Sequence, residues 1–282
     1  EQNAPELRKL TDQLYRSDNG WIKAIQRIIL GMGGAAALKE LGYTIDKFHL
    51  NEGHAVFAFV EKARGLAKNE IQELKKHFAY TCHTPVEAGH DKFNSGDLSN
   101  ILKKDDFEIV REFGRESGDL INLTLLAMNV SSAINAVARK HRDVMHLQFP
   151  AYKERIQYVT NGVHTHTWIS DRFKALYEKY PSAFKEIKSN PFVLENARNL
   201  KDDKNFRQDL WQAHQDNKGE FCSFLGKWGL GRDIFTVCWA RRVAAYKRPS
   251  LILQDVQKLL EMAKKYGPIQ IIFAGMAHPQ DN

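Results

Sequence analysis

The chain has 282 residues, 43% of them hydrophobic and 27% charged, which is enough apolar material for a real core. No apolar run approaches the roughly 18 residues of a membrane span, and residues 1–5 lack the basic start and apolar stretch of a signal peptide, so no membrane partner is expected. With 41 Lys and Arg against 34 Asp and Glu, the net charge of +7 favours anionic partners, and three cysteines without a CxxC pair predict reduced cytoplasmic thiols. The first residue is Glu, not Met, which predicts a piece of a longer chain or a processed one.

A short apolar run followed by a polar turn and then a helical pattern recurs along the chain. The four runs with their turns are residues 47–50 with "NEGHA", 78–81 with "CHTPVEAGHD", 156–160 with "NGVHTHTW" and 235–240 with "RRVAAYKRP". Alternating strands and helices predict an α/β fold with parallel strands. Ligands of such sheets gather beyond the carboxyl ends of the strands, so the four turns are the expected functional surface.

Two stretches interrupt this pattern. The run "GMGGAAAL" at residues 31–38 lacks the Lys-Ser/Thr of a phosphate loop and the spacing of GxGxxG, so its glycines predict a helix break and a close packing point. Residues 171–230 are charged and predominantly helical in pattern, and we expect them to connect two α/β domains whose boundary lies near residues 161–168.

The last unit of the pattern is the clearest. Residues 235–240 predict a strand, residues 250–266 an amphipathic helix with Pro249 in its first turn, and residues 269–273 a second strand. Together they have the length of a βαβ crossover.

Four cations, Arg241, Arg242, Lys247 and Arg248, follow the strand at residues 235–240. They precede the predicted helix, at the end where the helix dipole disfavours positive charge. A bound phosphate would compensate, because free backbone N–H groups at a helix start, Arg forks and Lys ammonium groups all favour oxyanions. We therefore favour a phosphate site over a solvated basic surface.

The other three turns are rich in neutral donors and acceptors. Asn and His side chains beside glycines, with one Trp, suit a hydroxyl-rich ligand. No HExxH motif, Cys/His knuckle or carboxylate-rich set is present, so no metal is expected.

Taken together, the turns resemble the α-glucan (glycogen, starch or maltodextrin) phosphorylases, and most closely their shorter bacterial and archaeal members. The motifs that carry the resemblance are "LYRSDN" (14–19), "ILGMGGAAAL" (29–38), "HLNEGHAVFAF" (49–59), "YTCHTPVEAGHDKF" (80–93), "NLTLLAMNVSSAINAVARKH" (122–141), "VTNGVHTHTW" (159–168), "ARRVAAYKRPSLIL" (240–253) and "IIFAGMAHPQD" (271–281). The resemblance implies a GT-B-like α/β architecture in which two Rossmann-like domains face a cleft, each incomplete here. Residues 1–160 would be the C-terminal part of the glucan-side domain, and residues 161–282 the linking helices and the first part of the phosphate-side domain.

The implied reaction is the reversible phosphorolysis of an α-1,4-glucan or maltodextrin by orthophosphate, giving α-glucose 1-phosphate with retention. Pyridoxal 5'-phosphate is the implied cofactor, and its phosphate group acts as a proton relay. On the phosphate side, Arg242 and Lys247 match positions that hold the substrate phosphate, and Arg241 and Lys247 match positions at the cofactor phosphate. Tyr246 matches a sugar contact, and Trp168 an aromatic position against the cofactor ring.

On the sugar side, the resemblance implies contacts to the hydroxyls of the transferred glucosyl unit. His83, Asn161 and Asn19 match the positions that make these contacts, and His83 is included among the catalytic residues. His54 and Glu52 match residues that line the cleft and bind substrate.

Several positions depart from the family pattern. Arg27 stands where members usually carry Glu, Met276 where they carry Lys, and His166 where Pro is common. The cofactor-binding lysine of the family falls downstream of Asn282, so this chain alone is expected to form no Schiff base and to have no phosphorolytic activity.

Other functions remain open alongside this one. A sugar-nucleotide-dependent glucosyltransferase of the same GT-B shape also places Arg and Lys after a second-domain strand, but "HLNEGHA", "HTPVEAGHD" and "TNGVHT" favour a phosphorylase. A non-catalytic glucan-binding fragment is a further alternative. Lys and Arg are dispersed along the chain, so no nucleic-acid partner is expected. A sheet edge left unpaired at residue 282 favours association, which makes a homodimer a candidate assembly.

Overall fold

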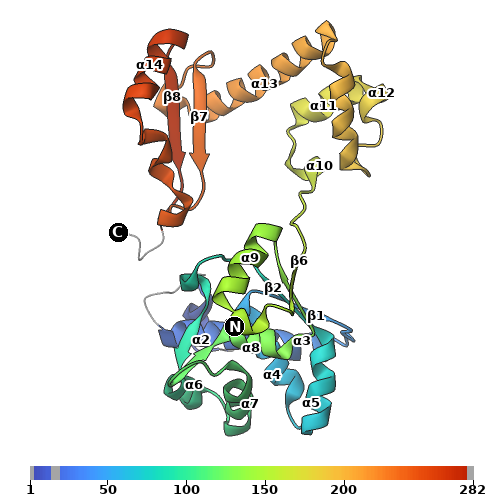
Figure 1. The fold of residues 1–282 in the computed structure, drawn as a ribbon, viewed down its shortest axis with the longest axis vertical. Coiled ribbons are helices and arrows are strands. Elements are labelled where there is room, and N and C mark those ends of the chain that lie inside the picture. The colour runs from blue at the N-terminus through green and yellow to red at the C-terminus, as the bar shows by residue number, and fades with distance from the viewer. Residues whose placement is uncertain (1–2, 14–19, 278–282) are drawn as a thin grey trace. The chain divides into compact units, whose positions relative to one another are not determined.

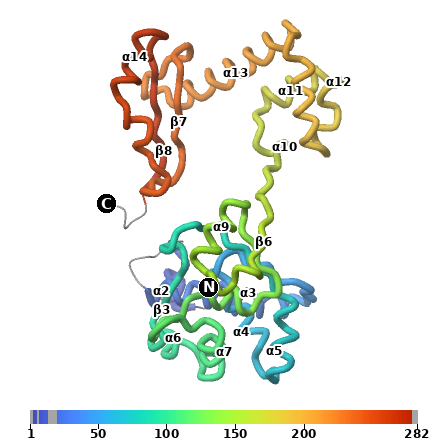
Figure 2. The backbone as a smooth tube through the Cα atoms, in the orientation of Figure 1, coloured from blue at the N-terminus to red at the C-terminus, as the bar shows by residue number. Residues whose placement is uncertain are grey.

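The structure is a computed structural model that describes residues 3–13 and 20–277. It is a mixed α/β fold with two compact units, Glu1–Asn161 and Gly162–Asn282, between which the chain passes once (Figures 1 and 2). Within the described ranges, every helix is too short or too polar to cross a bilayer.

The first unit is built around a four-stranded parallel sheet in the order β1-β2-β5-β6. Its strands are β1 (Phe48–Asn51), β2 (Phe78–Cys82), β5 (Ala133–Ala136) and β6 (Ile156–Tyr158). Three of them confirm the strands predicted at residues 47–50, 78–81 and 156–160, and β5 was not predicted. One row of paired residues runs across all four strands and is buried throughout. It consists of Leu50, Tyr80, Ile134 and Ile156.

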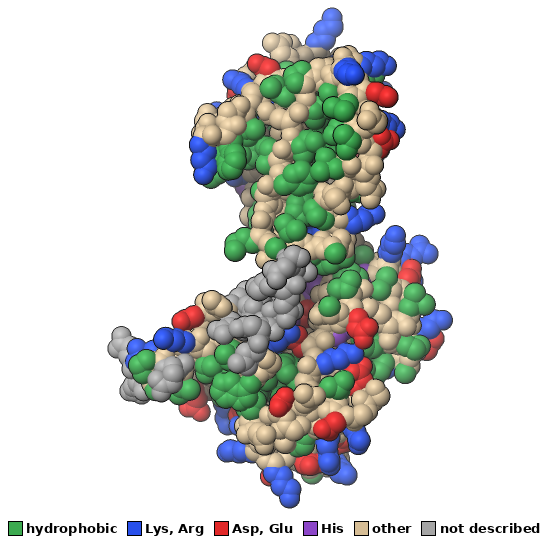
Figure 3. All heavy atoms as spheres, turned by 90° about the vertical axis from the view of Figure 1, so that its left-hand side faces the viewer, with side chains coloured by type: hydrophobic (Ala, Val, Ile, Leu, Met, Phe, Trp, Pro, Cys, Tyr) green, Lys and Arg blue, Asp and Glu red, His purple; other side chains and the backbone are tan. Residues whose placement is uncertain are grey.

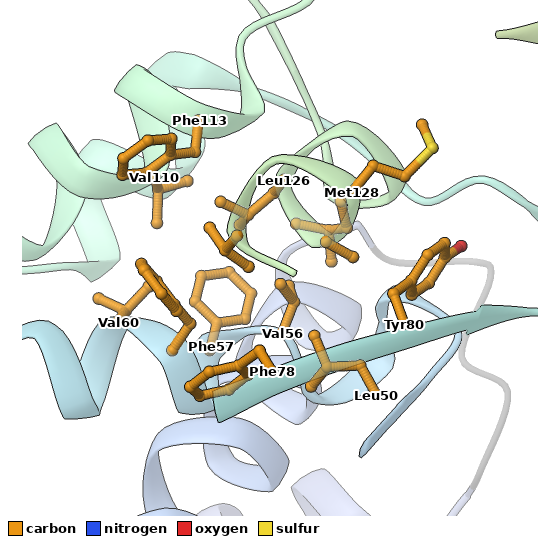
Figure 4. Close-up of a cluster of buried hydrophobic side chains, with 14 of the residues drawn as sticks. Leu50, Val56, Phe57, Val60, Phe78, Tyr80, Val110, Phe113, Leu126 and Met128 are labelled. Atoms are coloured by element: carbon orange, nitrogen blue, oxygen red, sulfur yellow. The ribbon is translucent and has the colours of Figure 1, made fainter. Parts of the chain in front are cut away.

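Helices make up most of the rest of the first unit. They are α1 (Pro5–Arg8), α2 (Gly20–Ile28), α3 (Gly34–Glu40), α4 (Phe57–Ala63), α5 (Lys68–Leu74), α6 (Ser95–Ile101), α7 (Lys104–Gly114), α8 (Leu123–Val130) and α9 (Arg139–Gln148), and a small antiparallel pair is formed by β3 (Lys92–Asn94) and β4 (Leu120–Asn122). Phe57 and Val60 of α4 and Leu126 of α8 pack over Phe78 and Tyr80 of β2 (Figure 4). Burying this many aromatic and branched side chains is the main stabilisation of the unit.

The glycine-rich stretch does not break the helix. From α2 the chain continues through a π-helical turn, Ile29–Gly33, directly into α3, so the predicted break is wrong. The predicted close packing is confirmed at Gly31, where a Cβ would lie 2.7 Å from the backbone nitrogen of Ala58 and 2.8 Å from the Cβ of Phe57. A π turn keeps the chain helical while it inserts an extra residue, and this is how the glycines are accommodated.

Two glycine substitutions in this helix should have opposite effects. Gly31→Ala forces a methyl group against α4 and is expected to lower the free energy of unfolding by about 1–3 kcal/mol. Gly34→Ala meets nothing within 4 Å and is expected to raise it by about 0.5–1 kcal/mol. Urea unfolding measures both, and equal effects of the two substitutions would contradict the packing described for Gly31.

The second unit begins with helices, as predicted for residues 171–230. They are α10 (Thr165–Trp168), α11 (Asp171–Lys179), α12 (Pro181–Phe184), a 3-10 stretch (Pro191–Leu200) and α13 (Lys204–Phe224). Leu176, Phe184 and Phe206 form their small buried core.

A βαβ crossover completes the second unit, as predicted. Strands β7 (Phe235–Ala240) and β8 (Ile269–Ala274) pair in parallel along their whole length, with α14 (Val256–Tyr266) between them in sequence. Large hydrophobic side chains remain exposed here, and Figure 3 shows many on this unit.

Candidate functional site

Three of the four polar turns follow strands of the one sheet in the first unit. The turn with Glu52 and His54 follows β1, the turn with His83 follows the adjacent β2, and Asn161 follows β6. Because parallel strands end at the same edge, these predicted sugar-side residues lie along one edge of the sheet. Asn19, the remaining predicted sugar contact, lies outside the described residues.

Glu52 has an unusual backbone and a buried carboxylate. Its φ of 60° and ψ of −175° fall in a region that is almost restricted to glycine, which costs on the order of 1–3 kcal/mol. The side chain is only 6% exposed. Oε1 accepts a hydrogen bond from the backbone N–H of His83 at 2.7 Å, and Oε2 accepts one from the Tyr80 hydroxyl at 3.4 Å. Glu52 therefore joins the turn after β1 to the turn after β2.

His54 lies beside a buried carboxylate, Asp91, which the prediction did not include. Asp91 Oδ1 is 2.6 Å from Lys23 Nζ, and Oδ2 is 2.9 Å from Arg27 Nε and 3.5 Å from His54 Nδ1. Lys23 and Arg27 lie one turn apart on α2, so one face of that helix carries both cations. Arg27, noted as a departure from the family pattern, is 7% exposed and pairs with Asp91.

The charges around Asp91 decide its ionisation. Burial raises the pKa of this carboxyl, but the interaction with His54 and the charges of Lys23 and Arg27 outweigh burial and hold the pKa well below its ordinary value. Asp91 is thus ionised at neutral pH and neutralises part of the positive charge beside the candidate site.

Two buried polar groups of β2, the Tyr80 hydroxyl and the Cys82 thiol, stay neutral. Burial raises the pKa of the Tyr80 hydroxyl well above its usual value, and burial raises the pKa of the Cys82 thiol to about 12. A thiol in this state is a poor nucleophile, so Cys82 is a packing residue.

The basic turn, residues 241–248, follows β7 in the second unit. Its backbone is fixed against the end of β8 and the residues after it, because Arg241 N–H donates to the Ala274 carbonyl at 2.9 Å and Val243 N–H donates to the Met276 carbonyl at 3.0 Å. A Cβ on Gly275 would lie 2.0 Å from the Arg241 carbonyl oxygen, so only glycine fits at that contact. Met276, noted above as an expected departure from the resembled family, thus lies at the basic turn.

One part of the predicted phosphate site is wrong. The cations do not stand at the start of the predicted helix over residues 250–266, because residues 249–253 form a separate 3-10 turn and α14 begins only at Val256. The first turn of α14 is already capped by Asp255, whose carboxylate accepts the Lys258 N–H at 2.9 Å. The predicted site therefore does not stand at the N-terminus of α14, and its positive charge comes from the cationic side chains of the turn.

The structure gathers most of the predicted phosphate-side residues in one turn. Arg241, Arg242, Tyr246 and Lys247 all belong to the basic turn, and Lys247 Nζ lies 5.7 Å from the centre of the Tyr246 ring. Trp168 belongs to a different element, the short helix α10, and its side chain is 78% exposed. The sugar-side residues and the basic turn are in different units.

Sequence reasoning missed Asp91 and Lys23. Asp91 stood inside the quoted motif "YTCHTPVEAGHDKF" and was passed over, while Lys23 carried no motif. Among residues 3–13 and 20–277, no group of three or more His, Cys, Asp or Glu side chains is arranged to hold a metal ion.

Comparison with known proteins agrees with these features. The family model described as carbohydrate phosphorylase matches residues 102–282. The whole chain is 31% identical, over 322 aligned residues, to a glycogen phosphorylase of Aquifex aeolicus, and 99% of it is 32% identical to a maltodextrin phosphorylase of Thermococcus litoralis. A glycogen phosphorylase of Mycobacterium tuberculosis is 27% identical over the whole chain.

The alignments cover 46% of the Aquifex protein and 37% of the Thermococcus protein, so the chain spans less than half the length of these relatives. The family match itself extends over more than half of the chain. The chain therefore belongs to the carbohydrate phosphorylase family.

Proposed function

We propose that this chain is part of a glycosyltransferase that catalyses reversible phosphorolysis of α-1,4-glucan, releasing α-glucose 1-phosphate with retention. The observation that carries the proposal is the basic turn at the end of β7, in a chain that belongs to the carbohydrate phosphorylases. Relatives named glycogen phosphorylase and maltodextrin phosphorylase support a glucan or maltodextrin as the sugar substrate.

In this proposal the first unit binds the sugar. His83, Asn161 and Asn19 contact hydroxyls of the transferred glucosyl unit, and His54 lines the pocket. Glu52 was proposed as a substrate contact, but both of its carboxylate oxygens already accept hydrogen bonds from the protein. We assign it the support of the His83 turn as its main role.

The second unit holds phosphate. Arg242 and Lys247 would bind the substrate phosphate, and Tyr246 would contact the sugar. Arg241, Lys247 and Trp168 would hold pyridoxal 5'-phosphate, the two cations at its phosphate and Trp168 at its ring. The donor set fits such a group, because a guanidinium fork and an ammonium on one turn are complementary to phosphoryl oxygens. When bound, the cofactor phosphate supplies the group that exchanges a proton with the substrate phosphate. Concentrated positive charge at this turn would neutralise both phosphates during transfer.

The proposed architecture is GT-B, with residues 1–160 on the glucan side and residues 161–282 on the phosphate side of a cleft between Rossmann-like domains. A cytoplasmic location and a homodimer are part of the same proposal, and neither nucleic acid nor a membrane is a partner in it.

The test uses the longest natural polypeptide that contains this chain. We expect it to release glucose 1-phosphate from maltoheptaose only when orthophosphate is present, and the 282-residue chain alone to release none. Consumption of ADP-glucose without a need for orthophosphate would identify a sugar-nucleotide-dependent enzyme instead. Binding of maltoheptaose without any turnover would identify a non-catalytic glucan-binding protein.

A further inference from the structure

The turn after β5 is the one strand end of the sheet that carries no predicted site residue. Strand β5 lies between β2, which leads to His83, and β6, which leads to Asn161. Its own turn runs into α9, where His141 occupies the first helical turn. The side chain of His141 is therefore placed between the two proposed sugar-binding turns.

His141 holds the backbone of this turn. The side chain is 8% exposed, and its Nδ1 accepts a hydrogen bond from the Val137 N–H at 3.3 Å. An accepting Nδ1 requires the ring proton to sit on Nε2. That Nε2 is buried and makes no hydrogen bond within the described part of the chain.

The turn after β5 is also hydrogen-bonded to the segment that carries Asn161. The Val137 carbonyl accepts the Asn161 N–H at 3.0 Å, and the preceding Ala136 carbonyl accepts the Val159 N–H at 2.9 Å. His141 and Asn161 thus bind the two polar groups of one residue, Val137. Any movement of Val137 would displace the backbone of Asn161.

The imidazole of His141 is neutral, as its role as a hydrogen-bond acceptor requires. Burial lowers the pKa of the imidazole, which keeps the ring neutral and Nδ1 free to accept, while the Thr84 carbonyl and the Glu52 carboxylate act in the opposite direction and the charge of His83 adds to the lowering. Strand β5 pairs with β2 through Ala136 and Cys82, so the turn after β5 lies beside the segment that carries His83. Glu52 holds that segment from β1, and the turn that His141 fixes lies next to it on the other side.

We propose that His141 is a positioning residue, which fixes the turn after β5 and thereby sets the backbone of Asn161 and of the His83 turn for sugar binding. The ring itself contacts no sugar. The effect on turnover rests on the proposed function, whereas the effect on backbone order does not.

The experiment compares substitutions that retain or lose the acceptor at the Nδ1 position. His141→Asn places a carboxamide oxygen near that position, while His141→Gln carries its oxygen one bond further out and His141→Leu has none. Hydrogen–deuterium exchange is measured on peptides covering residues 80–85, 134–138 and 159–162 of the longest natural polypeptide. We expect exchange in all three segments to rise about tenfold or more in His141→Leu and His141→Gln, and to stay within about threefold of wild type in His141→Asn.

Activity gives a second readout. A displacement of about 1 Å can cost on the order of a hundredfold in rate, so kcat/KM for maltoheptaose is expected to fall by about ten- to a hundredfold in the Leu and Gln variants and by less than about fivefold in the Asn variant. His146 provides the matched control, because it is on the same helix and its Nε2 lies 3.3 Å from the Ile156 carbonyl, at the start of β6. His146→Leu should leave kcat/KM within about threefold of wild type.

The proposal is overturned if exchange in His141→Leu rises only in residues 134–138 and stays at the wild-type level in residues 80–85 and 159–162. It is also overturned if the Asn variant exchanges as fast as the Gln variant, and this comparison holds even if the Leu variant does not fold. The predicted exchange pattern in a protein without phosphorolytic activity would support the positioning role and refute the proposed function.

Discussion

Replacing Arg242 with leucine is expected to lower kcat/KM for orthophosphate by about a hundred- to a thousandfold. Arg242 is in the basic turn, which does not stand at the start of α14, so we expect the cationic side chains to provide most of the attraction for phosphoryl oxygens. Removing one preorganised group that stabilises developing negative charge typically has an effect of this size. Arg242→Lys keeps the charge but loses the planar fork, so an intermediate loss is expected. Initial rates of glucose 1-phosphate release over a range of orthophosphate concentrations measure both.

Lys264→Ala is the matched control for this substitution. Lys264 is an exposed cation in the last turn of α14, so its removal changes the net charge equally without touching the basic turn. We expect kcat/KM to change less than about twofold. If Arg242→Leu behaved like Lys264→Ala, the basic turn would be an ordinary solvated surface.

Replacing Asp91 with alanine is expected to lower the free energy of unfolding of the first unit by about 3–5 kcal/mol. The substitution leaves Arg27, which is almost fully buried, and Lys23 without their partner, and an uncompensated buried charge has a cost of this size. Combining Asp91→Leu with Arg27→Met removes both charges and should recover most of the loss. The unfolding free energy of the first unit is measured in urea, with hydrogen exchange of peptides from α4 and α8 as the signal, because both helices belong to this unit.

The surface pair of Arg111 and Glu108 provides the control. Their Nη2 and Oε2 atoms are 2.6 Å apart, as close as Lys23 and Asp91, but both side chains are about half exposed. Glu108→Ala should therefore lower the free energy of unfolding by less than about 1 kcal/mol. Equal losses of unfolding free energy in Asp91→Ala and Glu108→Ala would show that burial does not determine how strongly the ion pairs of Asp91 stabilise the fold.

The contribution of Asp91 to the free energy of unfolding is also expected to depend on pH. Its pKa in the folded protein is held below the ordinary 3.8, so the stabilisation is complete above that value and is lost as the pH falls through the lower folded value. The difference between wild type and Asp91→Ala should stay constant from pH 5 to pH 8 and shrink only below about pH 4. A difference that vanished between pH 5 and pH 7 would contradict this assignment to Asp91.

Strands with strong apolar runs could be predicted to within about two residues, as for β2, β7 and β8. Strand β5 could not, because Ala133–Ala136 has small and polar side chains and pairs only because β2 and β6 lie on either side of it. The start of α14 was misplaced because the apolar stripe already begins in the 3-10 turn at residues 249–253, while the cap at Asp255 decides where the helix begins.

For the candidate site, the sequence could indicate which residue types follow each strand but not how they are held. The hydrogen bond from His83 N–H to Glu52 joins residues 31 positions apart, and the pair of Arg27 and Asp91 joins residues 64 positions apart. The left-handed backbone of Glu52 has no local signature, because glutamate rarely adopts it. Such features follow from tertiary packing, so only the folded structure reveals them.

The π turn at Ile29–Gly33 sets the rotational phase between two halves of one continuous helix. Each residue of an α-helix advances the chain by about 100° around the axis. With the extra residue in place, Lys23 and Arg27 face Asp91 while Gly31 meets Ala58. A single-residue deletion in this segment would turn one half relative to the other by about a quarter of a revolution, so that the cations and the glycine contact could no longer be satisfied together.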